Sequence, residues 1–423
     1  MRLNLHDYSG HPFQVELSRY LAGRGHEVLH GYAMQYITGH GNLTVSPEDP
    51  STLRIEGLRA EREMHKYDPV GRARFEFSYA KAWREQLDRE DFDVVVACNV
   101  PLFALAAMRQ YFARRRQPWV LWHQDIYSLG VGAEAGRRLP QPLSGAAKAQ
   151  FERMERAQVR SADRVVAIGD GFVQQYQRWG LNADHVTVIP NWAPLQELTP
   201  GPRDNAWTQR MGIPSEPVRL LYAGTLGRKH NPMLLLELLD KVKARGVDAI
   251  LLVCSEGVVA DFLQEQAGDR TDVRVLGFQP AEDFSDVLAS ADAVIAVLEP
   301  DAAEFCVPSK VLSHMCAGRP TIALMPESNA SANDVRFTGG YVGAPTPEGA
   351  DGAAAWLAAA RADETALARI GHACRNFAET RFDINTIGQR FEEILAEVAQ
   401  RPVGLDDGTP LAIVTEDGVP NVA

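Results

Sequence analysis

Short apolar runs alternate along the chain with longer stretches in which apolar residues recur every three to four positions. The runs have the length of strands and the stretches between them have the period of helices, a pattern typical of parallel sheets built from β-α-β units. In the first half, the predicted strands are 2–8, 26–32, 92–100, 119–127, 164–169 and 186–191. The pattern then restarts, with predicted strands at 218–224, 249–257, 273–278, 293–298 and 321–326. The sequence therefore predicts two similar α/β domains.

The boundary between the two halves is marked by repeated proline and glycine in residues 192–217, which predicts a linker near 195–215. Two helical patterns follow residue 363, and the second is strongly amphipathic. The resulting division is an N-terminal domain, a C-terminal domain, a C-terminal helix and a tail, at 1–200, 215–380, 381–400 and 401–423.

Composition narrows the class of protein. A net charge of -12 argues against nucleic-acid binding. No apolar run reaches the roughly 20 residues needed to span a bilayer, and the first 13 residues lack a secretory apolar stretch, so we expect a cytoplasmic protein. The five cysteines are scattered without CxxC spacing, which predicts reduced core thiols and no metal site.

The charge is unevenly spread. Residues 1–194 hold 24 basic and 22 acidic residues, whereas 195–423 hold 19 and 33. In the first half, the stretch 54–86 and the segment 109–119, with Arg114, Arg115 and Arg116, mix basic and aromatic residues. These are either solvated helix faces or a surface for an anionic membrane or anionic acceptor. Under the second interpretation, they would lie on the acceptor side of the first domain.

A short helix is predicted over 308–317, with Pro308 at its first position and Gly318 just past its end. Its apolar residues form one stripe, and the other faces carry Ser309, Lys310, Ser313 and His314. One interpretation is a buried helix with a solvated lysine. The other is an anion site, because a helix start offers unpaired N–H groups and Lys310 adds a full charge beside them.

A second candidate anion site follows the strand at 218–224, where Gly224 and Gly227 permit a tight turn that ends in Arg228 and Lys229. Ligands of open α/β sheets bind at the carboxyl ends of the strands. Lys310 also follows a strand end of the same predicted sheet. Three cations would therefore converge where a diphosphate could bind.

In the first domain, Gly10 and His11 follow the first strand, and His123 ends a later strand, close to Asp125 and Tyr127. A lone histidine beside an acid is common in protein cores, so this signal is weak by itself. The motifs GxSxG, HExxH, GxxxxGK[ST] and GxGxxG after the first strand do not occur. Serine hydrolases, zinc proteases, P-loop proteins and simple dehydrogenases therefore lose support.

Four ordered segments together resemble glycosyltransferase family 4. They read SGHPFQVELSRYLAGRGHEV, ADRVVAIGDGFVQQYQRWGLNADHVTVIPNW, YAGTLGRKH and VPSKVLSHMCAGRP. The family comprises retaining, metal-independent nucleotide-sugar transferases. The resemblance implies a GT-B fold, in which two Rossmann-like doubly wound domains face each other across a cleft and C-terminal helices pack back toward the first domain. It implies no cofactor beyond a nucleoside-diphosphate sugar as co-substrate.

The resemblance assigns roles to individual residues. His123 and Glu304 are the implied catalytic residues, with His123 contacting the transferred sugar and Glu304 matching the first of two glutamates separated by seven residues. Ser313 lies one position beyond the place of the second glutamate. The residues implied to bind the donor are Gly10, His11, Gly224, Thr225, Arg228, Lys229, Ser309, Lys310, Val311 and Ser313.

The function implied is transfer of a hexose or related sugar to a hydroxyl acceptor, in polysaccharide or glycoconjugate biosynthesis. The resemblance leaves open a lipid-linked acceptor with peripheral membrane contact through the first domain. Two alternatives stay open as well: a GT-B epimerase or hydrolase of nucleotide sugars, and a non-catalytic two-domain sugar-binding protein.

Overall fold

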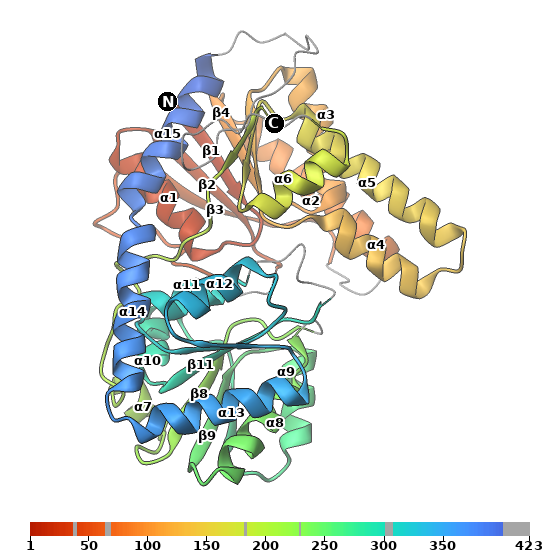
Figure 1. Cartoon of the computed structure of the whole chain (residues 1–423). Coiled ribbons are helices and arrows are strands. Elements are labelled where there is room, and N and C mark those ends of the chain that lie inside the picture. The colour runs from red at the N-terminus through yellow and green to blue at the C-terminus, as the bar shows by residue number, and fades with distance from the viewer. Residues whose placement is uncertain (37–39, 64–68, 182–183, 228–229, 301–307, 401–423) are drawn as a thin grey trace, which may run out of the picture. The chain divides into compact units, whose positions relative to one another are not determined.

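The computed structural model describes residues 1–36, 40–63, 69–181, 184–227, 230–300 and 308–400. The chain forms two compact units, each around its own parallel sheet (Figure 1). Unit 1 comprises Met1–Pro190 and the C-terminal residues from Ile384, and unit 2 comprises Asn191–Asp383. The predicted tail, 401–423, lies outside the described residues.

The sheet of unit 1 has seven strands in the order β3-β2-β1-β4-β5-β6-β7, and all of its neighbouring pairs are parallel. The strands are β1 (Arg2–Asp7), β2 (Glu27–Ala33), β3 (Leu53–Leu58), β4 (Val94–Cys98), β5 (Trp119–His123), β6 (Arg164–Ala167) and β7 (Val186–Val188). Their side chains are mostly buried because helices cover both faces, which explains the nearly continuous apolar runs in the sequence.

The helices of unit 1 are α1 (Pro12–Gly23), α2 (Pro69–Leu87), α3 (Leu102–Arg115), α4 (Tyr127–Arg138), α5 (Leu143–Ser161), α6 (Asp170–Arg178) and α15 (Ile384–Gln400). Helices α1 and α15 pack together on one face of the sheet, and α2 and α3 pack together on the other (Figure 1). Each crossover helix begins near the carboxyl edge of the sheet and runs back toward the amino edge.

Helix α15 confirms the predicted return of a C-terminal helix to the first domain. Its Phe391 is fully buried against Trp122 of β5, with ring centroids 4.6 Å apart. Glu392 pairs with His26 at 2.9 Å, and Glu397 pairs with Arg164. The preceding helix, α14 (Ala366–Arg381), belongs to unit 2.

The basic and aromatic stretch 54–86 extends over both edges of the unit 1 sheet, so only part of it lies beside Arg114 and Arg115. It begins with β3, an edge strand that the charge-rich pattern concealed, and continues into α2. Arg114 and Arg115 end α3, and therefore lie at the opposite edge of the sheet from the start of α2. Arg115 is also paired with Asp88 at 2.7 Å.

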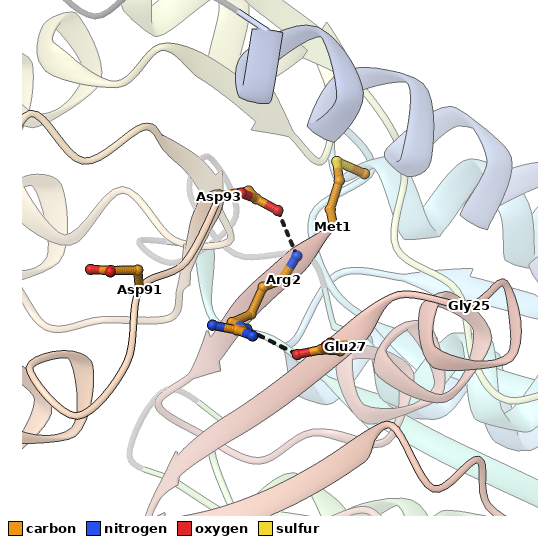
Figure 2. A pocket seen from close by; sticks show the side chains of 6 residues that line it. All are labelled: Met1, Arg2, Gly25, Glu27, Asp91 and Asp93. Carbon is orange, nitrogen blue, oxygen red and sulfur yellow. Dashed lines mark hydrogen bonds and ion pairs between the residues drawn. The ribbon is translucent and has the colours of Figure 1, made fainter.

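The amino edge of the same sheet carries a hollow of about 380 Å³ lined by Met1, Arg2, Gly25, Glu27, Asp91 and Asp93 (Figure 2). Arg2 spans it, because its side chain donates to Glu27 at 2.9 Å and its backbone N–H donates to Asp93 at 2.7 Å. The hollow lies at strand beginnings, the edge at which open α/β sheets do not bind ligands.

The sheet of unit 2 has six parallel strands in the order β10-β9-β8-β11-β12-β13. They are β8 (Val218–Ala223), β9 (Ala249–Cys254), β10 (Val273–Leu276), β11 (Ala293–Val297), β12 (Thr321–Leu324) and β13 (Tyr341–Gly343). Besides α14, the helices are α7 (Ala206–Arg210), α8 (Met233–Ala244), α9 (Val258–Ala267), η2 (Ala281–Asp283), α10 (Phe284–Ala289), α11 (Lys310–Cys316), α12 (Ala330–Phe337) and α13 (Pro347–Ala362).

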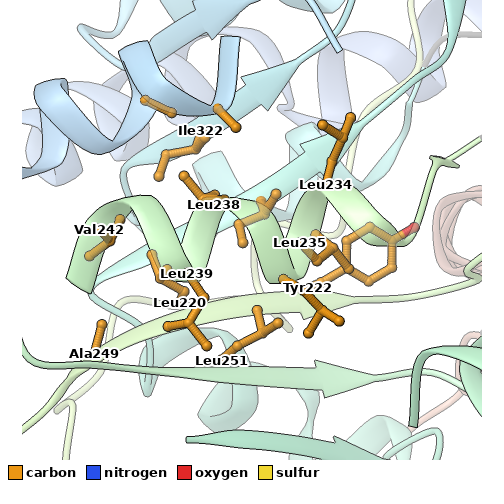
Figure 3. Close-up of a cluster of buried hydrophobic side chains, with 14 of the residues drawn as sticks. Leu220, Tyr222, Leu234, Leu235, Leu238, Leu239, Val242, Ala249, Leu251 and Ile322 are labelled. Atoms are coloured by element: carbon orange, nitrogen blue, oxygen red, sulfur yellow. The ribbon is translucent and has the colours of Figure 1, made fainter. Parts of the chain in front are cut away.

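The core of unit 2 forms where the leucine-rich face of α8 meets β8 and β9 (Figure 3). Leu235, Leu238 and Leu239 are fully buried, and Tyr222 of β8 is buried in the same cluster. Replacing one such leucine by alanine typically costs 2–5 kcal/mol. The cluster fixes β8, whose carboxyl end carries one of the predicted anion sites.

Residues 195–215, predicted as a linker, are part of unit 2. Asn205 caps α7 by accepting a hydrogen bond from the Thr208 N–H at 3.0 Å, and Trp207 is fully buried. The proline and glycine residues therefore mark turns within a folded segment.

Two other sequence predictions concern the cysteines and the membrane spans. Cys98, Cys254, Cys316 and Cys374 are buried free thiols, as predicted, and Cys306 lies outside the described residues. Burial raises the pKa of Cys254 to about 12 and that of Cys374 to about 11. Within the described ranges, no helix combines the length and the apolar character needed to cross a membrane.

Candidate functional site

The turn after β8 is held in one conformation at the carboxyl edge of the unit 2 sheet. Gly224 has φ +112°, a conformation that side-chain-bearing residues rarely adopt, and its N–H donates to the Cys254 carbonyl at 3.0 Å. The Leu226 N–H donates to Ser255 Oγ at 3.0 Å. Gly224 and Leu226 are therefore both fixed, and Thr225 lies between them.

Lys310, the first residue of α11, lies beside this turn. Its ammonium nitrogen is 3.8 Å from the centroid of the Tyr222 ring and donates to the Tyr222 hydroxyl. That hydroxyl donates in turn to the Thr225 carbonyl at 2.9 Å. A Cβ at Gly224 would lie 3.9 Å from Lys310 Cε. The structure thus brings three predicted donor-site residues together: Lys310, Gly224 and Thr225.

Helix α11 begins two residues later than predicted, because Ser309 precedes it as an exposed cap. The Val311 side chain is fully buried and its N–H donates to the Pro308 carbonyl at 3.1 Å, so this residue packs in the core. Ser313 is half-buried.

His314 is not on a polar face, as the sequence suggested, but almost fully buried. Burial, with a further contribution from the Lys310 charge, lowers its pKa to about 3. His314 is therefore neutral at pH 7 and adds no charge beside Lys310.

Three further predicted site residues, Arg228, Lys229 and Glu304, lie outside the described residues. Of the three predicted cations, Lys310 alone is therefore placed by the described part of the chain.

In unit 1, Gly10 forms the turn after β1. Its φ is +68°, and a Cβ there would lie 2.8 Å from a Leu43 methyl group, so a larger residue would strain the backbone and collide. The Asp7 carboxylate at the end of β1 accepts hydrogen bonds from the N–H groups of Ser9 and His11, at 3.1 and 2.6 Å. The loop that carries Gly10 and His11 is thus ordered by a fully buried acid.

The same acid connects β1 to its neighbour β4. Asn99 follows β4 with φ 56° and donates from Nδ2 to Asp7 Oδ1 at 2.8 Å. Tyr127, at the start of α4 after β5, donates from its hydroxyl to the Asn99 carbonyl at 2.8 Å. Residues after three neighbouring strands therefore meet at the carboxyl edge of the unit 1 sheet.

His123 ends β5 and is buried, and both of its ring nitrogens have hydrogen-bond partners. Nε2 lies 3.2 Å from Glu155 Oε1, and Nδ1 lies 2.6 Å from the Tyr176 hydroxyl. Because a carboxylate oxygen accepts, Nε2–H is the donor in the pair with Glu155. Glu155 also accepts from the Tyr127 and Ser128 N–H groups, each at 2.8 Å.

Sequence reasoning missed several polar residues of these two edges. Asp7 and Asn99 each lie one residue before the end of a predicted strand, so the strand-end rule could have found them. Glu155 and Tyr176 come from α5 and α6, 32 and 53 residues from His123, and no local pattern reports such a contact. Tyr222 is hidden within an apolar strand pattern.

Two family models match the chain. Residues 11–192 match the glycosyl transferase 4-like domain, and residues 217–361 match the glycosyl transferases group 1 domain. Together, the two matches span most of units 1 and 2. Among curated proteins, none matches the sequence.

Solved structures share the fold at low sequence identity. Sucrose-phosphate synthase from Thermosynechococcus elongatus superposes with a TM-score of 0.69 at 15% identity, covering 94% of this chain and 99% of that chain. HepE of Anabaena, solved in complex with UDP and glucose, gives 0.66 at 16% identity, covering 94% and 100%. A glycosyltransferase from Rickettsia africae gives 0.63 at 14%, covering 95% and 99%.

Proposed function

We propose that this chain, a glycosyltransferase of the GT-B fold, transfers a sugar from a nucleoside-diphosphate donor to a hydroxyl acceptor with retention of the anomeric configuration. The observation that carries the proposal is the ammonium group of Lys310, held beside the Gly224 turn at the carboxyl edge of the unit 2 sheet. A fixed cation beside a glycine turn at this edge suits a diphosphate.

For the donor, we propose UDP-sugars as the first class to examine, because HepE was solved with UDP-glucose. The diphosphate would lie against Gly224 and Thr225 and accept hydrogen bonds from Lys310, with Ser309 and Ser313 beside it. Arg228 and Lys229 are proposed as further cations for the same diphosphate.

The proposed reaction needs no protein nucleophile and no metal. An acceptor oxygen forms a bond to C1 of the sugar on the face from which the diphosphate departs, the bond from C1 to the diphosphate oxygen breaks, and the acceptor proton passes to the leaving phosphate. Lys310 would stabilise the negative charge that develops on that phosphate. His123 and Glu304 are proposed to contact the sugar, and Gly10 and His11 to lie close to it.

We propose polysaccharide or glycoconjugate biosynthesis in the cytoplasm as the setting. A water-soluble acceptor is our first choice over a lipid-linked one. The basic residues expected to contact a membrane include Arg115, which is paired with Asp88, and Lys81, which is paired with Glu61 at 2.6 Å. Surface pairs of this kind leave less net positive charge for an anionic bilayer.

Thermal unfolding with UDP, GDP and ADP tests the donor class. A ligand that binds only the folded state raises stability by RT ln(1 + [L]/Kd), so the matching diphosphate should raise Tm and the others should not. The matching nucleotide sugars are then incubated with and without sugar acceptors. Transfer with retention supports the proposal, release of free sugar or an isomer without acceptor indicates a hydrolase or epimerase, and no shift with any diphosphate contradicts it.

A further inference from the structure

Arg72 stands at the carboxyl edge of the unit 1 sheet, although the strand-end motifs did not mark it. It is the fourth residue of α2, which follows β3, and a crossover helix begins at the edge where its strand ends. Glu76 and Tyr79 follow at i+4 and i+7 on the same helix face. Tyr79 packs edge-on against Tyr8, just past the end of β1, with ring centroids 4.9 Å apart.

Glu76 orients the guanidinium of Arg72 through one nitrogen only. Arg72 Nε donates to Glu76 Oε1 at 2.9 Å, and the other oxygen of Glu76 accepts from the Phe103 N–H at 2.9 Å. The Glu76 side chain is 3% exposed, whereas that of Arg72 is 40% exposed. Among the described residues, neither terminal nitrogen of Arg72 has a hydrogen-bond acceptor or an acidic partner.

Three tyrosines, Tyr8, Tyr36 and Tyr127, lie within electrostatic reach of this guanidinium. Burial raises the pKa of Tyr8 and of Tyr127, and the charge of Arg72 opposes both shifts, which places the guanidinium within electrostatic reach of the two hydroxyls. Tyr36 also contributes to the raised pKa of Arg72, and its ring centroid lies 5.1 Å from that of Tyr8. Arg72 is therefore a partly buried cation on the helix face whose Tyr79 packs against Tyr8, which in turn contacts Tyr36.

Tyr127 connects this setting to the proposed reaction centre. Its hydroxyl donates to the Asn99 carbonyl, and Asn99 bonds Asp7, which orders the loop of Gly10 and His11. Glu76, the partner of Arg72, accepts from the Phe103 N–H at the start of α3, which follows β4. An anion bound by Arg72 would therefore lie at the same edge of the sheet as these loops.

We propose that Arg72 binds an anionic group of the acceptor through its two terminal nitrogens, with Tyr36 and Tyr127 beside the acceptor sugar, so that the enzyme selects a negatively charged sugar acceptor. This inference rests on the proposed function. A guanidinium presents parallel N–H donors that match the two oxygens of a carboxylate or phosphate. The group is therefore the carboxylate of a uronic acid or the phosphate of a sugar phosphate.

Direct binding measurements distinguish a uronic acid from a sugar phosphate as the bound acceptor. Glucuronate, glucose 6-phosphate and glucose are titrated into the full-length protein and followed by ligand-observed NMR. We expect at least one of the two anionic sugars to bind 10-fold or more tightly than glucose, and the preferred one identifies the group. In Arg72→Gln, this preference should fall to less than 3-fold, whereas Arg72→Lys should keep part of it because the charge remains.

Two controls keep the outcome interpretable. Lys81→Gln removes another exposed cation from α2 and should leave the preference unchanged. Arg72→Lys retains a cation for buried Glu76, so it reports on binding even where Arg72→Gln unfolds. UDP affinity, measured in parallel, depends on residues of unit 2 and should not change in any of these variants.

A wild-type protein that binds glucose as well as it binds both anions would overturn the inference, as would a preference that survives in Arg72→Gln. The proposed function fails differently. In that case, no nucleoside diphosphate binds and no sugar is transferred to any of the three acceptors, whatever the result of the acceptor titrations.

Discussion

The ammonium group of Lys310 has a defined position before any ligand binds, because the Tyr222 ring and hydroxyl both contact it. Preorganisation of this kind reduces the entropy lost when an anion is bound. The neutral state of His314, one turn further along α11, means that the positive charge at this helix start belongs to Lys310.

Replacing Lys310 by alanine should weaken UDP binding by about 1.5–3 kcal/mol, the range for hydrogen bonds to charged groups. Isothermal titration measures the change, and the Tm without ligand should barely move. Lys241→Ala is the matched control, since it removes a half-buried lysine of the same unit whose partners are Glu237 and Asp351. Equal UDP affinity in Lys310→Ala and the wild type would show that Lys310 is only a solvated charge.

Tyr222→Phe keeps the ring under the ammonium group and removes the hydroxyl that links Lys310 to Thr225. We expect UDP affinity to fall by about 0.5–1.5 kcal/mol, the net contribution of one hydrogen bond, and uridine affinity to stay constant. A purely structural effect would instead lower Tm and weaken both ligands together.

His123→Ala should reduce the transfer rate by about 10²-fold, the scale of one lost positioning or acid–base contact. The Tm should fall as well, because Glu155 and Tyr176 each lose a buried partner. Tyr176→Phe separates the two effects, since it disturbs the network and leaves the imidazole in place. Wild-type turnover by a folded His123→Ala variant would remove His123 from the site.

At the scale of elements, α15 shows how a helix late in the sequence completes a sheet formed early in it. Phe391 is the anchor, so Phe391→Ala should destabilise unit 1 by about 3–5 kcal/mol in a denaturant titration. UDP affinity should persist at low denaturant, because the residues proposed to bind the diphosphate, Gly224, Thr225 and Lys310, belong to unit 2. Phe337→Ala, at a side chain that is 79% exposed, is the control and should change stability by less than 0.5 kcal/mol.

Among the described strands, the sequence predicted those with a continuous apolar run, and it missed β3 and β13. Strand β3, with the sequence LRIEGL, lies at the end of the sheet and pairs with β2 on one side only. Its polar residues therefore resemble those of a loop. Strand β13 has only three residues, which is too short for a periodic signal. Both form because a neighbouring strand supplies a template, and a single-sequence pattern does not contain that tertiary information.

The same limit applies to the candidate site. Gly10, Gly224 and Lys310 were found because strand ends and turns are local features. The partners that fix them, Asp7 excepted, arrive from other elements: Tyr222 reaches Lys310 across 88 positions of sequence. Contacts at such separations are set by the packing of the sheet.

At the scale of the whole molecule, we expect the folded state of both units to lose stability in acid. Burial lowers the pKa of His30 in unit 1 to about 4 and that of His314 in unit 2 to about 3. Below pH 6.5 the unfolded chain binds these protons first, so stability falls as pH drops toward the folded-state values, by about 1.4 kcal/mol per unit for each histidine.

Tm measured from pH 7 to pH 4 should therefore decline steeply below pH 6.5. His314→Gln, which cannot be protonated, should flatten the decline for unit 2 while leaving that of unit 1. A Tm that is constant between pH 6.5 and pH 4.5 in the wild type would contradict this account.

The position of α15 also has a consequence for the order of events on the ribosome. Trp122 and its neighbours on β5 are synthesised early, but the helix that covers them lies at the end of the described chain. Unit 2 is synthesised after β5 and before α15. At about 5–20 residues per second, its roughly 200 residues take about 10–40 s to emerge. During that interval, nascent unit 1 presents an uncovered tryptophan surface, so chaperone binding should be concentrated on this half until α15 has emerged.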